Sequence, residues 1–234
     1  MFNLNTEHMV RSLQSLINYR IGATDGEIGH VKDFYFDDQT WRLRYLVVET
    51  GNWLFGRKVL ISPAALSTPE WDGDSIPANL TTDQVKGSPD IDTEKPVSRQ
   101  QEADLHHYYS WPGLGFPGGG FVTTGMVGAV VDPTTPLEDK IAMEAGEYDR
   151  HLRSYRDVVG LAVVDDSASL GKVTDMLADT ANWSVVNIDV SVDETDAGKR
   201  MLLATADVEV IDSAESSIRV IKDRGNFADG FAAL

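Results

Sequence analysis

The fold is indicated by one stretch near the start of the chain, which reads Thr24-Asp25-Gly26-Glu27-Ile28-Gly29-His30-Val31-Lys32-Asp33-Phe34-Tyr35-Phe36. Its first residues favour a tight turn, because Asp-Gly is a strong hairpin signal. The remainder begins with alternating apolar and polar residues and ends in β-forming aromatics, so residues 28–36 are predicted to be a strand.

Two further strands are predicted at residues 41–48 and 58–62. In the first of them apolar residues alternate with arginines, in the order Trp41, Arg42, Leu43, Arg44 and Tyr45. The apolar side chains are expected to face a core and both arginines to face water. Pro63 ends the second strand. Short strands joined by tight turns are typical of a small β-barrel or sandwich.

The same pattern recurs 142 positions later in the chain. Without a gap, residues 18–66 align with residues 160–208. The identical pairs include Gly29 with Gly171, Val31 with Val173, Asp33 with Asp175, Asp37 with Asp179, Trp41 with Trp183, Val48 with Val190, Gly56 with Gly198 and Leu60 with Leu202. Because the matches include tryptophan and glycine and keep one register, they indicate a duplicated fold unit. Trp41 and Trp183 are therefore expected to occupy equivalent buried positions.

Strands are accordingly predicted in the second copy. They are expected near residues 162–164, 171–177, 183–192 and 200–204, with 208–211 and 217–221 able to close a barrel. One segment has diverged, since the apolar residues 51–56 correspond to the acidic residues 193–198.

The first copy resembles the PRC-barrel domain, on residues 23–34, 41–48, 51–54 and 59–63. This family is named for the cytoplasmic domain of the photosynthetic reaction centre H subunit, and a ribosome maturation factor shares the barrel. Residues 92–102 and 108–112 resemble the linker of bacterial proteins with two PRC domains, and residues 151–154 resemble the lead-in to their second barrel. The resemblance implies docking to larger assemblies and supplies no catalytic motif.

The expected fold is mainly β, with two small PRC-type β-barrels in tandem joined by a Pro- and Gly-rich linker with short helices. Residues 12–88 and 151–223 are predicted to be the barrels, residues 89–150 the linker and residues 224–234 a tail. Within the linker, residues 99–109 are predicted to form a helix capped by Ser98, and residues 136–145 a shorter one. Another short helix is expected to start at Thr81 or Thr82.

Charge and composition exclude several classes of function. With 37 acidic and 20 basic residues the formal net charge is −17, which disfavours nucleic-acid and anionic membrane partners. The chain has no cysteine, so disulfides and thiol chemistry are excluded. We find neither a signal-peptide pattern nor an apolar run of membrane-spanning length, and a cytoplasmic protein without membrane insertion is expected.

Candidates for metal binding or catalysis are weak. Glu102 and His106 share a helix face, but a metal site normally needs three or four ligands. Asp193, Glu194 and Asp196 lack the glycine and the distal glutamate of a calcium loop. Nucleophile elbows and phosphate-binding loops are missing from the sequence. We therefore expect no enzyme, no catalytic residues, no metal and no cofactor.

The strongest functional candidate is Trp53-Leu54-Phe55, which lies between two predicted strands where large apolar residues are unusual. Exposed aromatic residues in loops often anchor partners, although these residues could instead cap the open end of the barrel. The sequence thus predicts a non-catalytic interaction or scaffolding protein, docking to a protein assembly or forming homo-oligomers. The alternative is an RNA-processing or ribosome-assembly factor, by analogy with the maturation factor.

Overall fold

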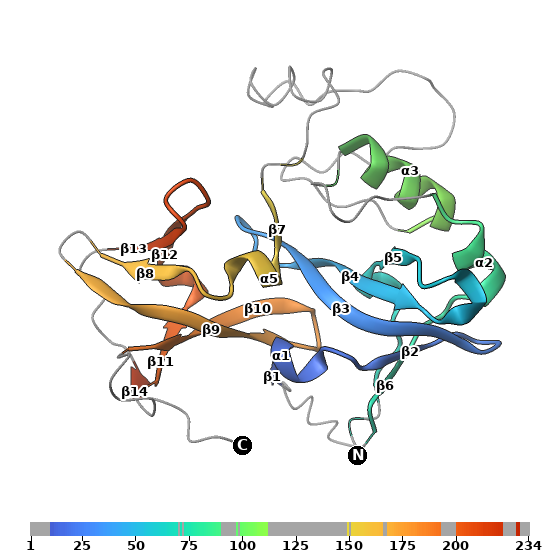
Figure 1. Ribbon diagram of the computed structural model, residues 1–234, viewed down its shortest axis with the longest axis horizontal. Coiled ribbons are helices and arrows are strands. Elements are labelled where there is room, and N and C mark those ends of the chain that lie inside the picture. The colour runs from blue at the N-terminus through green and yellow to red at the C-terminus, as the bar shows by residue number, and fades with distance from the viewer. Residues whose placement is uncertain are drawn as a thin grey trace, which may run out of the picture. The chain divides into compact units, whose positions relative to one another are not determined.

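The computed structural model describes residues 10–69, 71, 73–89, 97, 99–111, 149, 151–165, 168–192, 200–221 and 228–229. Its elements are mainly strands (Figure 1). The predicted cap Ser98, the predicted helix at residues 136–145 and the acidic residues 193–198 lie outside the described residues. None of the described helices is long and apolar enough to cross a membrane.

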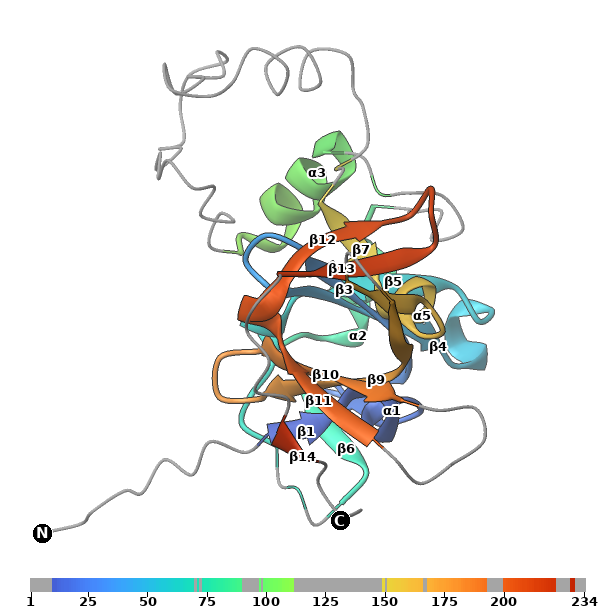
Figure 2. The ribbon, with the colours of Figure 1, turned by 90° about the vertical axis from the view of Figure 1, so that its left-hand side faces the viewer.

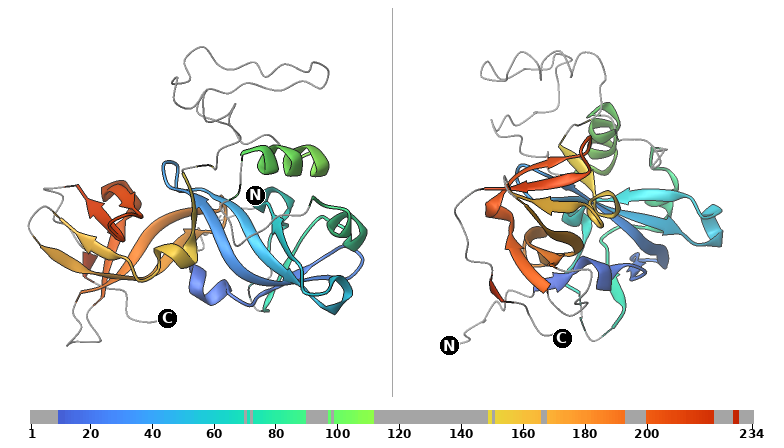
Figure 3. Two further views of the ribbon diagram at one scale, coloured as in Figure 1. Left: turned by 45° about the horizontal axis from the view of Figure 1, so that its top comes forward. Right: turned by 60° about the vertical axis from the view of Figure 1, so that its left-hand side comes forward.

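The first of two sheets has eight strands. Its main path runs in the order β12-β13-β8-β9-β10-β11-β14, and β1 pairs with β9. The strand bounds are β1 (Val10–Ser12), β8 (Ala162–Val164), β9 (Ser169–Asp179), β10 (Ser184–Ser191), β11 (Arg200–Ala204), β12 (Val208–Asp212), β13 (Ser217–Val220) and β14 (Ala228–Asp229). Figure 2 shows β8 to β13 curving around a common centre, and the same strands are seen from other sides in Figure 3.

The second sheet has six strands in the order β5-β4-β3-β2-β6, with β7 paired to β3. Its strands are β2 (Arg20–Gly22), β3 (Glu27–Asp37), β4 (Leu43–Thr50), β5 (Lys58–Ile61), β6 (Ser75–Pro77) and β7 (Leu152–Ser154). Neither sheet closes into a barrel through the pairings of the described strands, so the tandem barrels stay a prediction.

The helices are short. They are α1 (Leu13–Leu16), α2 (Thr82–Lys86), α3 (Arg99–Tyr109) and α5 (Tyr155–Val158), with single 3₁₀ turns η1 (Asn52–Leu54), η2 (Pro63–Ala65) and η3 (Thr205–Asp207). Helix α3 has the predicted bounds. Helix α2 begins after Thr81, whose side chain forms a capping box with Gln84, because the hydroxyl and the amide each satisfy an end group of the backbone.

Contacts between residues divide the chain into two compact units, each made of segments that are separated in the sequence. The first unit draws on ranges 1–19, 30–47 and 151–234, and the second on 20–29 and 48–150. The long strands β3 and β4 thus contribute to both units. The predicted boundaries at residues 12–88, 89–150 and 151–223 stay a prediction.

Strand β4 differs from its predicted pattern. It begins at Leu43 rather than Trp41, because Trp41 has a left-handed backbone with φ 58°. Arg44 is buried, 6 % exposed, and its guanidinium lies 3.7 Å from the carboxylate of Asp37. The expectation that Arg44 faces water was wrong, since residues on both faces of this strand are buried. Arg42 is exposed as expected.

The two tryptophans also differ from each other. Trp183 is buried, 8 % exposed, whereas Trp41 is half-buried and stacks on Phe36 with ring centroids 5.6 Å apart. The prediction that both are buried is therefore wrong for Trp41.

Several contacts of the first unit recur at the 142-residue offset of the sequence. Residues Val10 to Ser12 pair with Asp179 to Leu177, and Leu152 to Ser154 pair with Asp37 to Tyr35, in the same antiparallel register. The Ser12 hydroxyl donates to Asp175, and the Ser154 hydroxyl donates to Asp33 at 2.6 Å. Adding 142 to one residue number of a contact and subtracting 142 from the other gives the matching contact.

Candidate functional site

The predicted contact residues lie in the loop 51–56 between β4 and β5, which we call the aromatic loop. Four backbone hydrogen bonds of 3.1–3.3 Å fold it into a single 3₁₀ turn followed by a tight reversal. At its base the Thr50 hydroxyl donates to the carbonyl oxygen of Arg57 at 2.9 Å. Phe55 and Gly56 both have positive φ, 57° and 70°. These bonds give the loop a defined shape.

Trp53 is anchored to the second unit by its polar edge. Its indole Nε1 donates to the carbonyl oxygen of Ile28 at 3.1 Å, while the residue stays 39 % exposed. A carbon at the Cβ position of Gly51 would lie 3.4 Å from the indole Cδ1, an ordinary contact distance, so the ring packs beside the backbone of this residue. The ring is therefore held in place with part of its surface open to solvent.

Phe55 has the opposite environment. It is 97 % exposed, so its ring contributes almost nothing to the core. It also adopts a left-handed conformation, which is unfavourable for a side chain with a Cβ by roughly 1–2 kcal/mol. Leu54, between the two aromatics, is half-buried. The left-handed backbone of Phe55 is held by the hydrogen bond from its N–H to the Asn52 carbonyl oxygen, while its exposed ring adds no burial to the folded chain.

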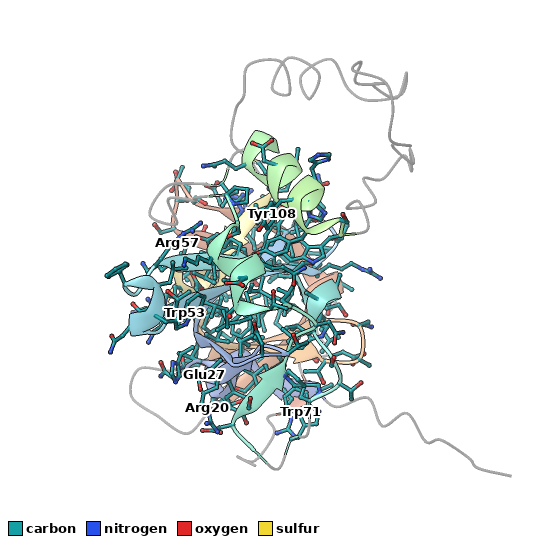
Figure 4. The ribbon with its side chains drawn as sticks, turned by 90° about the vertical axis from the view of Figure 1, so that its right-hand side faces the viewer. Arg20, Glu27, Trp53, Arg57, Trp71 and Tyr108 are labelled. Atoms are coloured by element: carbon teal, nitrogen blue, oxygen red, sulfur yellow. The ribbon has the colours of Figure 1, made fainter. Side chains whose placement is uncertain are left out.

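Arg57 ties the end of the loop to the segment after α2. Its guanidinium donates to the carbonyl oxygens of Ser88 and Pro89 at 2.9 and 2.7 Å. Figure 4 draws Arg57 between Trp53 and Tyr108. Charge-assisted bonds of this kind are stronger than neutral ones, so they hold the base of the aromatic loop against a neighbouring segment of the same unit.

Helix α3 adds a group of aromatic rings to the second unit. Tyr108 is 40 % exposed, and its hydroxyl donates to the carbonyl oxygen of Gln84 at 2.9 Å. Tyr109 stacks on Trp111 with ring centroids 4.2 Å apart, and burial raises the pKa of its hydroxyl. Trp53, Phe55 and Tyr108 are three of the large apolar residues that the structure describes as exposed; the others are Val10, Val210 and Ile221.

Among the weak metal candidates, the structure does not bring Glu102 and His106 into a ligand set. Glu102 is buried and His107 is exposed, while the His106 ring meets Trp111 edge-on at 5.8 Å. Within the described residues, we find no group of three or more His, Cys, Asp or Glu that could hold a metal ion. Asp193, Glu194 and Asp196 lie outside those residues.

One polar cluster was not predicted from the sequence. In the first unit, Asp38 accepts from Arg153 Nε at 2.6 Å and lies 2.8 Å from Nδ1 of His151, whose Nε2 is 3.1 Å from the Gln39 amide. Asp38 is 113 positions from His151 and 115 from Arg153, and no local motif predicts a pairing at such a separation. The cluster ties β7 and the residue before it to the turn after β3.

Comparison with known proteins identifies one domain. Residues 9–76 match the model of the PRC-barrel domain, so the chain contains a PRC-barrel domain over that range, which is under a third of its length. The aromatic loop lies inside the matched range. None of the curated proteins matches the chain.

Proposed function

We propose that this chain is a non-catalytic interaction protein that uses the aromatic loop to dock to a protein assembly or to another copy of itself. The observation that carries the proposal is the position of Phe55, which is 97 % exposed on a well-hydrogen-bonded loop. Aromatic side chains, Phe among them, are enriched at protein interfaces relative to the rest of the surface. A preformed loop also avoids the entropy cost of ordering it on binding.

The neighbouring Trp53 supports the same function. Its indole N–H is satisfied inside the protein by the Ile28 carbonyl, so burying the exposed part of its ring against a partner leaves no unpaired donor. Covering such apolar surface stabilises a complex by about 25 cal/mol for each Å² removed from water.

We also propose that residues 151–223 are a second copy of the PRC-type barrel. The support is the agreement between the sequence offset and the contacts. Gly29 and Gly171 both have positive φ, 157° and 146°, and at each a Cβ would meet a carbonyl oxygen, of Glu49 and Ser191 respectively. These two carbonyls are themselves 142 positions apart. A link to the reaction centre H subunit remains part of this proposal.

Two copies on one chain suit an adaptor. Joining two binding faces raises the effective concentration at the second face once the first is bound. The copies differ where the first has Trp53 and Phe55, because the corresponding residues of the second are Thr195 and Ala197, within a segment that carries the acids Asp193, Glu194 and Asp196. We therefore assign the apolar contact to the first copy.

The test compares wild type with the double variant Trp53→Ser/Phe55→Ser by pull-down from native lysate and by light scattering. We expect the variant to lose the captured partners or the self-association while its circular dichroism spectrum is unchanged. Val210→Ser, at another exposed apolar residue, is the matched control. If the double variant keeps the fold, the partners and the oligomeric state of the wild type, the proposal is wrong.

A further inference from the structure

The segments at the start of the two copies form two equivalent arms. The first arm is β1 with α1, residues 10–16, and the second is β7 with α5, residues 152–158. Each contains an apolar residue followed by Arg-Ser, and in each the serine caps the helical turn by accepting from the backbone N–H three residues on, at 3.0 Å in the first arm and 3.3 Å in the second. Each arm buries two apolar side chains, Leu13 and Leu16 in one and Tyr155 and Val158 in the other.

Each arm is bound by a carboxylate of the opposite copy. Asp175 accepts from the Ser12 hydroxyl and, at 3.1 Å, from the Gln14 N–H. Asp33 accepts from the Ser154 hydroxyl at 2.6 Å and from the Arg156 N–H at 3.2 Å. Each carboxylate also accepts from the N–H of the residue after it, at 2.7 and 2.8 Å, so both are held in the same orientation.

The two receptor strands share the pattern Val-x-Asp-x-x-x-Asp, residues 31–37 and 173–179. Both pair with three residues of an arm in the same register. The strands β3 and β9 therefore offer the same hydrogen-bonding groups at the same spacing. Each arm presents a serine hydroxyl and a backbone N–H, which donate to the aspartate of the strand that binds the arm.

We propose that two copies of this chain form a reciprocal dimer by exchanging these arms, so that the first arm of one molecule occupies β9 of the other. An exchanged dimer keeps every arm contact of the monomer, because only the identity of the chain that supplies the arm changes. The free-energy difference between the monomer and the exchanged dimer then depends mainly on the segment that joins the arm to the rest of the chain and on the protein concentration. A covalently joined arm acts at an effective concentration on the order of millimolar, so exchange is expected to compete when the protein folds at a comparable concentration.

The absence of cysteine from the sequence permits a direct test on the full chain. Arg11 and Ala178 are directly paired on β1 and β9. Chains carrying Arg11→Cys are mixed with chains carrying Ala178→Cys, unfolded in urea with reductant, refolded together at about 1 µM or 1 mM, and then oxidised so that directly paired cysteines are crosslinked as a disulfide. A non-reducing denaturing gel then measures the crosslinked dimer.

We expect at least tenfold more dimer from this mixture refolded at the high concentration than from Arg11→Cys mixed with Val210→Cys. Val210 pairs with Arg219 on β13 and not with an arm, so that mixture measures chance crosslinking. The double variant Arg11→Cys/Ala178→Cys, crosslinked within one chain at low concentration, reports that the arm is docked. If this chain crosslinks internally while the mixed single variants give no more dimer than the Val210→Cys control at either concentration, arm exchange between molecules does not occur. Such a result would leave the proposed role of the aromatic loop untouched.

Discussion

Trp41 and Trp183 adopt the same left-handed backbone conformation, with φ 58° and 55°. Each also accepts a hydrogen bond across the same contact, since the Leu43 N–H donates to the Trp183 carbonyl oxygen at 2.8 Å and the Val185 N–H donates to the Trp41 carbonyl oxygen at 2.7 Å. Arg42 and Ser184, the residues between these donors and acceptors, form an antiparallel bridge. Residues 41–43 and 183–185, which correspond at the 142-residue offset, therefore contact each other through equivalent backbone groups.

Because the two tryptophans share a backbone but not an environment, their replacement should have unequal effects. Trp183→Ala should lower the free energy of unfolding by about 3–5 kcal/mol, since the side chain is buried,. Trp41→Ala should cost clearly less, because its ring is half-buried and packs on Phe36 from one side. Urea denaturation of both variants measures the difference. Equal losses would mean that the two rings are equally buried in solution.

Gly29 and Gly171 should be the least replaceable of the glycines described. A Cβ at either would lie 2.0 or 2.1 Å from a backbone carbonyl oxygen, and backbone cannot move aside as the end of a side chain can. Overpacking and backbone strain together predict losses of about 2–3 kcal/mol or more for Gly29→Ala and for Gly171→Ala. The control is Gly22→Ala, where the nearest atom would be 3.8 Å away. Thermal unfolding that ranks Gly22→Ala with the other two would contradict this account.

The stability of the protein should depend on pH through Asp33. Burial raises the pKa of this carboxyl, against the lowering effect of hydrogen bonds from Ser154 and from the N–H groups of Phe34 and Arg156. The unfolded chain has the ordinary value of about 4, so between the two values the folded protein holds a proton that the unfolded chain releases. The contribution of Asp33 to the free energy of unfolding therefore rises as the pH falls through its folded pKa towards 4.

Replacing the carboxyl should remove this dependence. Subtracting the free energy of unfolding of Asp33→Asn from that of wild type, by urea titrations between pH 4 and 7, should give a difference that grows as the pH falls. The exposed carboxyl Asp83, changed to Asn, serves as the control. A difference that stays flat, or that grows as the pH rises, would show that burial does not dominate at Asp33.

The protein should not bind RNA at physiological salt. Its net charge of −17 repels phosphates, and RNA affinity depends on basic groups that release counterions. Fluorescence anisotropy with structured and single-stranded RNA measures this. Salt-sensitive binding at micromolar concentration or tighter would favour the alternative role in RNA processing or ribosome assembly.

Local signals in the sequence predicted most of the elements. The threonines at positions 81 and 82 predicted the start of α2, which Thr81 caps, and residues 162–164 and 200–204 form strands with the predicted bounds. Helix starts and short strands depend on residues that are neighbours in the chain, so they can be predicted from a single sequence. The left-handed Trp41 was not predicted, because such a backbone is unusual for any residue but glycine and depends here on contacts with residues near position 184.

The contacts between residues far apart in the chain could not be predicted from the sequence. Ser154 and Asp33 are 121 positions apart, and neither residue alone specifies the other. For the candidate site, the sequence placed Trp53 and Phe55 in a loop between strands, as the structure has them. Their unequal exposure depends on the distant carbonyl of Ile28, which binds one ring and not the other.

The most direct test of the proposed function replaces Phe55 with the photoreactive analogue p-benzoylphenylalanine in cells of the native source. Irradiation then captures whatever lies against this side chain, and mass spectrometry identifies it. We predict a discrete protein adduct, either a partner or a second copy of this chain, which is absent when the same analogue replaces the exposed Val210. Adducts of equal yield at both positions, or none at position 55 while the folded protein accumulates normally, would contradict the assignment of the aromatic loop as the docking site.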